Sequence, residues 1–174
     1  MSRRAVLTLP NIVSLARVAL VPVFIASSTP GARVAVVGAA ALTDMLDGWL
    51  ARRRQAASRV GALLDPIADR LFVLAAVATF LLEGALTLGQ TVVLLTRDIA
   101  TTIGFVVARS VSWLRPVELR ARGPGKAVTV LQVLALLAVL LWPAAVPVLL
   151  AVVGAASVLA IADYTLMLWR GRAR

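Results

Sequence analysis

The hydrophobic positions of the chain fall into six long apolar runs, separated by short polar or proline-containing segments. Runs of roughly 17–25 mainly apolar residues have the length that an α-helix needs to cross a bilayer. The pattern therefore predicts an all-α, polytopic integral membrane protein with six transmembrane helices. These helices are expected at residues 11–28, 33–52, 60–82, 88–109, 126–142 and 144–168. The length of 174 residues fits a single membrane-embedded domain over residues 1–174.

The basic residues lie almost entirely on one side of this predicted topology. If the N-terminus is inside, the segments on that side contain Arg3, Arg4, Arg52, Arg53, Arg54, Arg59, Arg109, Arg115, Arg120, Arg122, Lys126, Arg170, Arg172 and Arg174. The opposite loops contain Arg33. Since an excess of Lys and Arg marks the cytoplasmic side, we predict that both termini are cytoplasmic, in a bacterial cytoplasmic membrane or its equivalent. The net charge of +10 then indicates contact with anionic membrane lipids and no nucleic acid partner.

Composition narrows the chemistry that the chain can perform. A hydrophobic content of 61% is too high for an ordinary soluble domain. The sequence has no Cys and no His, which excludes disulfides, thiolate zinc sites, cysteine nucleophiles and imidazole ligands. Metal or acid–base chemistry must therefore rest on carboxylates, which suit hard cations such as Mg²⁺ and Mn²⁺.

Acidic residues are concentrated in one short stretch. Four of the eight acidic residues are Asp44, Asp47, Asp65 and Asp69. Ionisable groups at membrane depth cost roughly 2.5 kcal/mol or more each, so a functional role is expected. Spacings of three and four place each pair on one helix face, and a helical rise counted from Arg52 and Arg59 places all four roughly 8–15 Å inside the membrane. We expect the pairs to converge into one site near the cytoplasmic surface.

Such a site would hold two divalent cations. Four close carboxylates repel one another unless cations balance them, and a pair of Mg²⁺ or Mn²⁺ ions suits phosphoryl transfer. The alternative is an ion-pair network in which Arg52, Arg59 or Arg70 neutralises the aspartates. Four aspartates at matched depth, next to small residues, favour the metal site.

The residues around the aspartates leave room for a ligand. Gly48 would let a ligand approach the helix backbone closely, and Ala51 adds only a methyl group to the same helix face. Gly61 relieves crowding on the facing helix. Arg52 is suited to contact a phosphate.

The spacing D-x2-D-G-x2-A-R-x8-G-x3-D-x3-D, from Asp44 to Asp69, resembles the signature of the CDP-alcohol phosphotransferase family. Weaker similarity extends to Leu9–Arg17, Gly125–Gln132 and Asp163–Tyr164. The resemblance implies transfer of a phosphatidyl group from CDP-diacylglycerol to a polar alcohol, with release of CMP. It implies metal ligation by Asp44, Asp47, Asp65 and Asp69, a general-base role for Asp69, and cytidine diphosphate contacts from Gly48, Ala51, Arg52 and Gly61.

The motif does not specify the acceptor alcohol. The three weaker segments most resemble phosphatidylglycerophosphate synthases, which implies glycerol 3-phosphate. Arg97-Asp98 is instead similar to cardiolipin synthases, which would use phosphatidylglycerol, and an inositol-phosphate acceptor is a third alternative. Adjacent helical residues point about 100° apart, so we expect Arg97 and Asp98 to pair with other residues and not with each other.

A phosphorylated acceptor would need cationic contacts, for which the candidates are Lys126, Arg109 and Arg122. Lys126 is the only lysine of the chain and is expected to open a helix on the cytoplasmic side. For any single arginine, a role in topology or in binding lipid headgroups is the simpler interpretation.

Two other functional classes also use intramembrane aspartates. Prenyltransferases usually carry two separated Asp-rich motifs on more helices. A cation transporter would want polar residues that continue to the outer side, where this sequence is apolar. Both alternatives are therefore less favoured than the transferase. A homodimer is compatible with the family resemblance.

Overall fold

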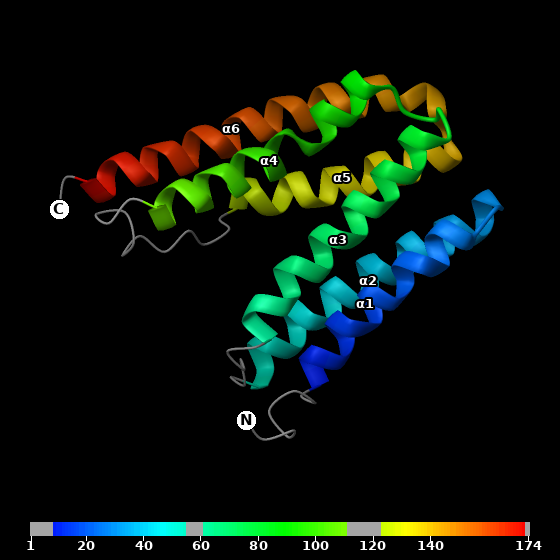
Figure 1. The fold of residues 1–174 in the computed structure, drawn as a ribbon, viewed down its shortest axis with the longest axis horizontal. Coiled ribbons are helices and arrows are strands. Elements are labelled where there is room, and N and C mark those ends of the chain that lie inside the picture. The colour runs from blue at the N-terminus through cyan, green and yellow to red at the C-terminus, as the bar shows by residue number, and fades with distance from the viewer. Residues whose placement is uncertain (1–8, 55–60, 111–122, 173–174) are drawn as a thin grey trace. The chain divides into compact units, whose positions relative to one another are not determined.

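The computed structural model describes residues 9–54, 61–110 and 123–172, with side chains described for residues 15–46, 68, 70–104, 110, 125 and 127–166. Over these residues the chain forms α1 (Leu9–Ala26), α2 (Pro30–Arg54), α3 (Gly61–Leu82), α4 (Leu88–Ser110), α5 (Gly123–Leu141), the short 3₁₀ helix η3 (Pro143–Ala145) and α6 (Val146–Arg172) (Figure 1). The prediction of an all-α chain with six helices is confirmed, and its boundaries differ from the observed ones by a few residues.

Proline and glycine set several of these boundaries. α2 begins at Pro30, and Pro124 is the second residue of α5. The first helical turn tolerates proline because its missing N–H would have no partner there. After α3, Gly84 has a φ of 73°, and the amides of Gly84 and Ala85 donate to the carbonyl oxygens of Leu81 and Phe80. This left-handed glycine cap ends the helix.

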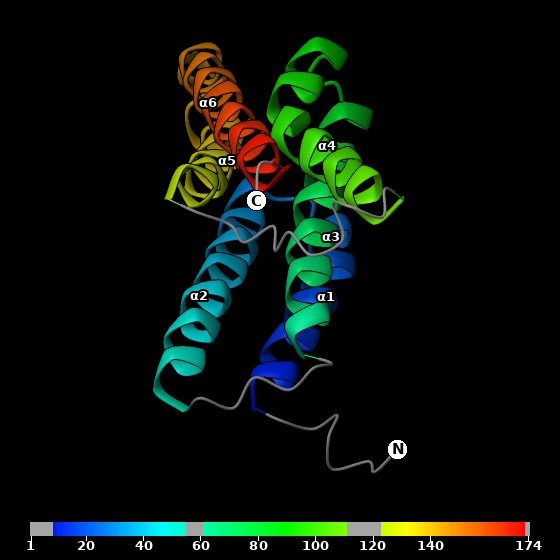
Figure 2. The ribbon, with the colours of Figure 1, turned by 90° about the vertical axis from the view of Figure 1, so that its left-hand side faces the viewer.

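The chain divides into two compact units, Met1–Ala85 and Leu86–Arg174, and each is described by itself. In the first unit α1 packs against both α2 and α3 (Figures 1 and 2), whereas the described parts of α2 and α3 make at most isolated backbone approaches to each other. Phe24 of α1 is fully buried, and its ring meets the edges of Phe72 and Phe80 of α3 at centroid distances of 5.9 and 5.6 Å. The helix α1 is therefore the common packing partner of the other two.

In the second unit, α4 and α5 both pack against α6. The buried side chains that form its core include Leu94, Leu136 and Val153. A Cβ atom added to Gly154 would lie 3.4 Å from a methyl carbon of Val93, so α4 and α6 approach closely at that point.

Within the described residues, one helical stretch, Pro143–Leu166, is both long and apolar enough to cross a membrane. Shorter apolar stretches lie at Leu15–Ala26, Arg70–Leu82 and Ala127–Leu141. The prediction of six helices is thus confirmed as secondary structure, while the six membrane crossings and the single catalytic domain stay predictions. The polar residues of the motif in α2 and of Arg97-Asp98 in α4 interrupt the apolar runs of those helices.

Candidate functional site

The four motif aspartates lie on two helices of the first unit. Asp44 and Asp47 are one turn apart on α2, and Asp65 and Asp69 are one turn apart on α3, so each pair shares a helix face. The side chain of Asp44 is 56% exposed. The other three aspartate side chains lie outside the described ones, so their convergence into one site stays a prediction. Among the side chains that are described, no group of three or more acidic residues could hold a metal ion.

The small residues of the motif occupy the same ends of these helices. Gly48, Ala51 and Arg52 lie in the last turns of α2, and Gly61 is the first residue of α3. Gly48 and Ala51 follow Asp44 by four and seven positions, spacings that put them on the Asp44 face. Their proposed contacts with a nucleotide fall outside the described side chains and stay predictions.

An ion pair joins the beginning of α2 to the chain just after α3. The Nη1 and Nη2 atoms of Arg33 donate to the two carboxylate oxygens of Glu83 at 2.5 and 2.6 Å. Its Nε donates to the carbonyl oxygen of Ser27 at 2.8 Å, and its guanidinium carbon lies 5.4 and 6.0 Å from the ring centroids of Phe24 and Phe80. The contact shows that α2 and α3 run antiparallel, as predicted, and it lies at the end away from the aspartates.

The Arg33–Glu83 pair also perturbs the acid–base behaviour of Glu83, which follows the last residue of α3. The hydrogen bonds from Arg33 hold the pKa of Glu83 below its ordinary value, and the positive charge of Arg33 acts in the same direction. Desolvation opposes this effect but is the smaller influence. Glu83 is therefore more acidic in the fold than in the unfolded chain.

The ion pair gives a fixed point from which the helical rise can be counted toward the motif. Asp47 follows Arg33, and Asp69 precedes Glu83, by 14 positions in each case, which corresponds to roughly 21 Å along each helix. Asp47 and Asp69 thus lie nearly level. Asp44 is about one turn nearer to the pair and Asp65 about one turn farther from it. Counting from Arg52 and Arg59 instead puts Asp47 and Asp65 at similar depths of roughly 8 and 9 Å, because it ends α2 at residue 52, whereas the observed helix ends at Arg54.

A buried cation on α1 contacts the motif helix. The side chain of Arg17 is only 2% exposed, and its Nη2 lies 3.6 Å from Oδ1 of Asp44. Its Nε donates to Oγ1 of Thr43 at 3.4 Å, and that hydroxyl donates to the carbonyl oxygen of Ala40 at 2.7 Å. The first motif aspartate is therefore already in contact with a charged group from a third helix.

In the second unit, a polar cluster links α4, α5 and α6. Arg97 donates from Nη1 to Oγ1 of Thr129 at 3.2 Å, and Gln132 donates from Nε2 to Oδ2 of Asp98 at 2.6 Å and to the carbonyl oxygen of Leu94 at 2.8 Å. Gly125 is buried, and a Cβ atom built on it would lie 2.5 Å from Tyr164 Oη and 3.1 Å from Arg97 Nη2. The resemblance segments 125–132 and 163–164 thus meet Arg97 in space.

The expectation that Arg97 and Asp98 do not pair with each other is wrong. Arg97 Nη1 lies 3.5 Å from Asp98 Oδ1. Adjacent Cα–Cβ bonds of a helix diverge by about 100°, but the arginine side chain is long enough for Nη1 to reach the carboxylate of its neighbour. The further partners that we expected do exist, since Thr129 accepts from Arg97 and Gln132 donates to Asp98.

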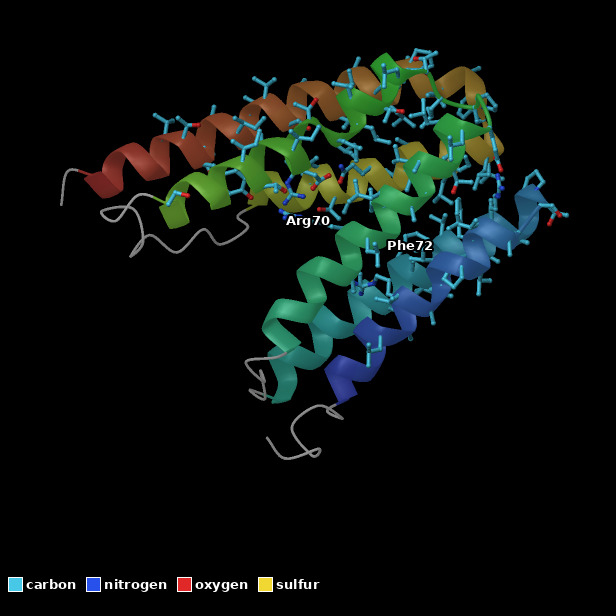
Figure 3. All side chains as sticks on the ribbon, in the orientation of Figure 1. Arg70 and Phe72 are labelled. Carbon is cyan, nitrogen blue, oxygen red and sulfur yellow. The ribbon has the colours of Figure 1, made fainter. Side chains whose placement is uncertain are left out.

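The predicted acceptor contacts are placed only by their backbone. Arg109 lies near the end of α4, and Lys126 lies in the first turn of α5, as expected for a residue that opens a helix. Arg122 and the side chains of Arg109 and Lys126 lie outside the described residues, so phosphate binding by them stays a prediction. Arg70 is half-buried on α3 and points to the side of the helix opposite to Phe72 (Figure 3).

The sequence did carry a signal for the two arginine contacts that pattern reasoning missed. Arg17 is a lone cation inside an apolar run, and Arg33 stands at the start of another. A buried charge in such a run needs a partner, which predicts an acidic residue on a neighbouring helix. Nothing in the periodicity identifies Asp44 or Glu83 as that residue.

Comparison with known proteins gives a consistent picture. The CDP-alcohol phosphatidyltransferase family model matches residues 7–169. A Mycobacterium tuberculosis protein provisionally named cardiolipin synthase is 36% identical over 120 residues, which cover 66% of this chain and 57% of that protein. A Streptomyces coelicolor cardiolipin synthase (CMP-forming) is 40% identical over 102 residues, which cover 53% of this chain and 47% of that one.

A third relative has the other activity. The chloroplastic and mitochondrial CDP-diacylglycerol–glycerol-3-phosphate 3-phosphatidyltransferase 1 of Arabidopsis thaliana is 49% identical over 76 residues, which cover 40% of this chain and 26% of that protein. The matched part of the chain therefore spans about half the length of the Mycobacterium and Streptomyces relatives and about a quarter of the length of the Arabidopsis relative. The names of the relatives thus divide between two activities, cardiolipin synthase and glycerol-3-phosphate 3-phosphatidyltransferase.

Proposed function

Because the chain belongs to the CDP-alcohol phosphatidyltransferase family, we propose that it transfers a phosphatidyl group from CDP-diacylglycerol to an alcohol and releases CMP. The observation that carries this proposal is the complete motif from Asp44 to Asp69, placed on two antiparallel helices within the matched residues 7–169. Membership of this membrane-bound family also makes a prenyltransferase or a cation transporter untenable. The reaction belongs to phospholipid biosynthesis.

The donor set of the motif fits hard divalent cations. Asp44, Asp47, Asp65 and Asp69 offer carboxylate oxygens, which Mg²⁺ and Mn²⁺ prefer, and the side chain of Asp44 is 56% exposed although it contacts Arg17. These four residues would hold two divalent ions, in keeping with the general metal dependence of the family. Cations held there would supply charge stabilisation to the attacking hydroxyl oxygen and to the phosphate of the departing CMP.

The remaining motif residues bind, orient and accept a proton. Gly48, Ala51, Arg52 and Gly61 contact the cytidine diphosphate in this proposal, and the two glycines allow close approach to the backbone. The acceptor hydroxyl oxygen attacks the lipid-side phosphorus, a new ester bond forms, and the bond from that phosphorus to the CMP oxygen breaks. Asp69 takes the hydroxyl proton as general base.

Glycerol 3-phosphate is the acceptor that we favour, giving phosphatidylglycerophosphate. Support comes from the meeting of Gly125, Thr129, Gln132 and Tyr164 in one polar cluster, since these are the residues in which the chain resembles phosphatidylglycerophosphate synthases. Lys126, Arg109 and Arg122 would contact the acceptor phosphate. The second candidate is phosphatidylglycerol, with cardiolipin as the product. The 40% identity to the Streptomyces coelicolor enzyme favours it.

The proposal extends to the placement of the protein. The site lies near the cytoplasmic surface, both termini are cytoplasmic, and six helices embed the single catalytic domain in the membrane. The strong bias of basic residues supports this orientation. A homodimer stays a prediction.

A direct assay separates the candidate acceptors. The purified full-length chain in detergent is supplied with CDP-diacylglycerol, Mn²⁺ or Mg²⁺, and one acceptor at a time: glycerol 3-phosphate, phosphatidylglycerol or an inositol phosphate. We expect CMP release with glycerol 3-phosphate. Release with phosphatidylglycerol alone would transfer the assignment to cardiolipin synthesis, and binding of the CDP-lipid without CMP release under any condition would refute the enzymatic proposal.

The role of Asp69 has its own test. Asp69→Asn is expected to keep CDP-lipid binding and to lose turnover, because the amide cannot accept the hydroxyl proton. Retained turnover in this variant would remove Asp69 from the general-base role and leave it as a ligand only.

A further inference from the structure

Arg17 is the most deeply buried charged side chain among those described. A guanidinium in an apolar interior is unfavourable unless hydrogen bonds and an opposite charge compensate it. The contacts that compensate Arg17 include Oγ1 of Thr43 at 3.4 Å and Oδ1 of Asp44 at 3.6 Å, two successive residues of α2. Two of the described contacts of the buried guanidinium thus reach the start of the motif on α2.

The contact of Arg17 with α2 matters because Arg17 lies on α1, the helix that packs against both α2 and α3. α1 packs against both helices that carry the aspartates, while the described parts of those two helices make little contact with each other. Phe24 fixes α1 on α3 through the edges of Phe72 and Phe80. Arg17 lies two turns away on the same helix and contacts α2. α1 is therefore a common packing partner of the two motif helices, which the Arg33–Glu83 ion pair also joins at their far ends.

The side chain of Asp44 contacts a buried charged group and is also exposed to solvent. Oδ1 faces the buried guanidinium, yet the side chain remains 56% exposed. A ligating carboxylate that is held from behind by a hydrogen-bonding group keeps one orientation, and loss of such an outer partner typically weakens metal affinity by about 10–100-fold. Arg17 is placed as such an outer partner through the 3.6 Å ion pair of its Nη2 with Oδ1 of Asp44.

We infer that Arg17 is a positioning residue that holds the carboxylate of Asp44 in the orientation in which it ligates a divalent cation. The inference rests on the proposed function, because it takes Asp44 to be a metal ligand. Arg17 fixes the side chain through the Thr43 and Asp44 contacts, and its charge offsets part of the repulsion among the motif aspartates before a cation binds.

Mn²⁺ affinity measured on the full-length protein by electron paramagnetic resonance tests this role without reference to turnover. Arg17→Gln is expected to weaken Mn²⁺ binding by about 10–100-fold. Arg17→Lys keeps the charge but not the planar fork, so an intermediate loss of about 3–10-fold is expected. Thr43→Val removes the acceptor of Nε and is expected to weaken binding by at least about 3-fold.

The matched control is Arg33→Gln. Arg33 is also a buried arginine of the first unit, but it lies roughly 16 Å along α2 from Asp44. This variant is expected to lower the unfolding temperature and to leave Mn²⁺ affinity within about 2-fold of wild type, because a merely structural arginine does not orient a ligand.

The possible outcomes separate this inference from the proposed function. Wild-type or tighter Mn²⁺ binding by Arg17→Gln, or an equal loss in Arg33→Gln, would overturn the role of Arg17. If Arg17→Gln does not fold, wild-type affinity in both Arg17→Lys and Thr43→Val would overturn it, and weaker binding in either would support it. A wild-type protein that neither binds Mn²⁺ nor releases CMP contradicts the proposed function itself.

Discussion

Replacing Gly125 with alanine would add a methyl group at the most crowded of the described glycine positions. A Cβ atom at this position would lie 2.5 Å from Tyr164 Oη and 3.1 Å from Arg97 Nη2. Non-bonded heavy atoms at optimal separation lie about 3.5–4.0 Å apart, so the tyrosine hydroxyl must move by roughly 1 Å. Because the hydroxyl ends a rigid ring, the whole side chain has to swing on α6.

The expected magnitude follows from two opposing effects. Forcing an extra methyl group into a packed site typically costs about 1–3 kcal/mol. Alanine is favoured over glycine inside a helix by about 0.5–1 kcal/mol, and Gly125 lies in the first turn of α5, where this gain is smaller. We therefore expect Gly125→Ala to reduce the free energy of unfolding by about 1–2 kcal/mol.

Denaturant unfolding of the purified protein in detergent, followed by tryptophan fluorescence, measures this change. Tyr164→Phe in the same chain removes Oη and leaves Tyr164 Cζ, 3.6 Å from the added atom, at ordinary contact distance. The double variant should therefore recover about 1 kcal/mol of the loss, with the remainder due to Arg97. Gly104→Ala on α4 is the control, since its Cβ would meet nothing within 4 Å. The described packing would be refuted if Gly125→Ala were as stable as wild type and the double variant were as stable as Tyr164→Phe.

Three further predictions follow from other contacts. The folded pKa of Glu83 lies below its unfolded value, so the stabilisation from its carboxylate is complete above the unfolded pKa and is lost as pH falls through the folded pKa. The unfolding temperature of Glu83→Gln should therefore fall less than that of wild type below about pH 5, and an unchanged pH dependence would contradict this. Gln132→Leu leaves Asp98 without its 2.6 Å donor, and a loss of about 1–3 kcal/mol in unfolding free energy is expected, whereas neutral behaviour would argue against that hydrogen bond. Chelation with EDTA should abolish CMP release and added Mn²⁺ should restore it; release that persists without metal would exclude the carboxylate metal site.

Hydrophobic periodicity predicts the helices well because each helix is a local pattern. The expected segment 88–109 corresponds to α4, Leu88–Ser110. The largest errors at a helix start are three residues, at α2, which begins at Pro30 and not at residue 33, and at α5, which begins at Gly123 and not at residue 126. Glycine and proline in the stretch Gly123–Gly125 suggest a loop, yet the first turn of a helix accepts proline without losing a hydrogen bond.

The motif predicts which residues matter but not how they are supported. Spacing alone places Asp44 and Asp47 on one face, because helix geometry is fixed. The contact of Arg17 with Thr43 joins residues 26 positions apart, and that of Arg33 with Glu83 joins residues 50 positions apart. Such pairs depend on which helices pack together and in what rotation, and neither is encoded in the period of the hydrophobic residues.

The buried Arg17 has a consequence for the biosynthesis of the chain. In the proposed topology α1 reaches the membrane before α2, and an arginine within a membrane-spanning helix opposes insertion by roughly 2.5–3.5 kcal/mol. Asp44 and Thr43 emerge from the ribosome only later, with α2. α1 should therefore enter the lipid together with α2, as a pair and not as an independent segment, and a chain truncated after Ala26 is expected to insert less completely than one that ends after Arg54.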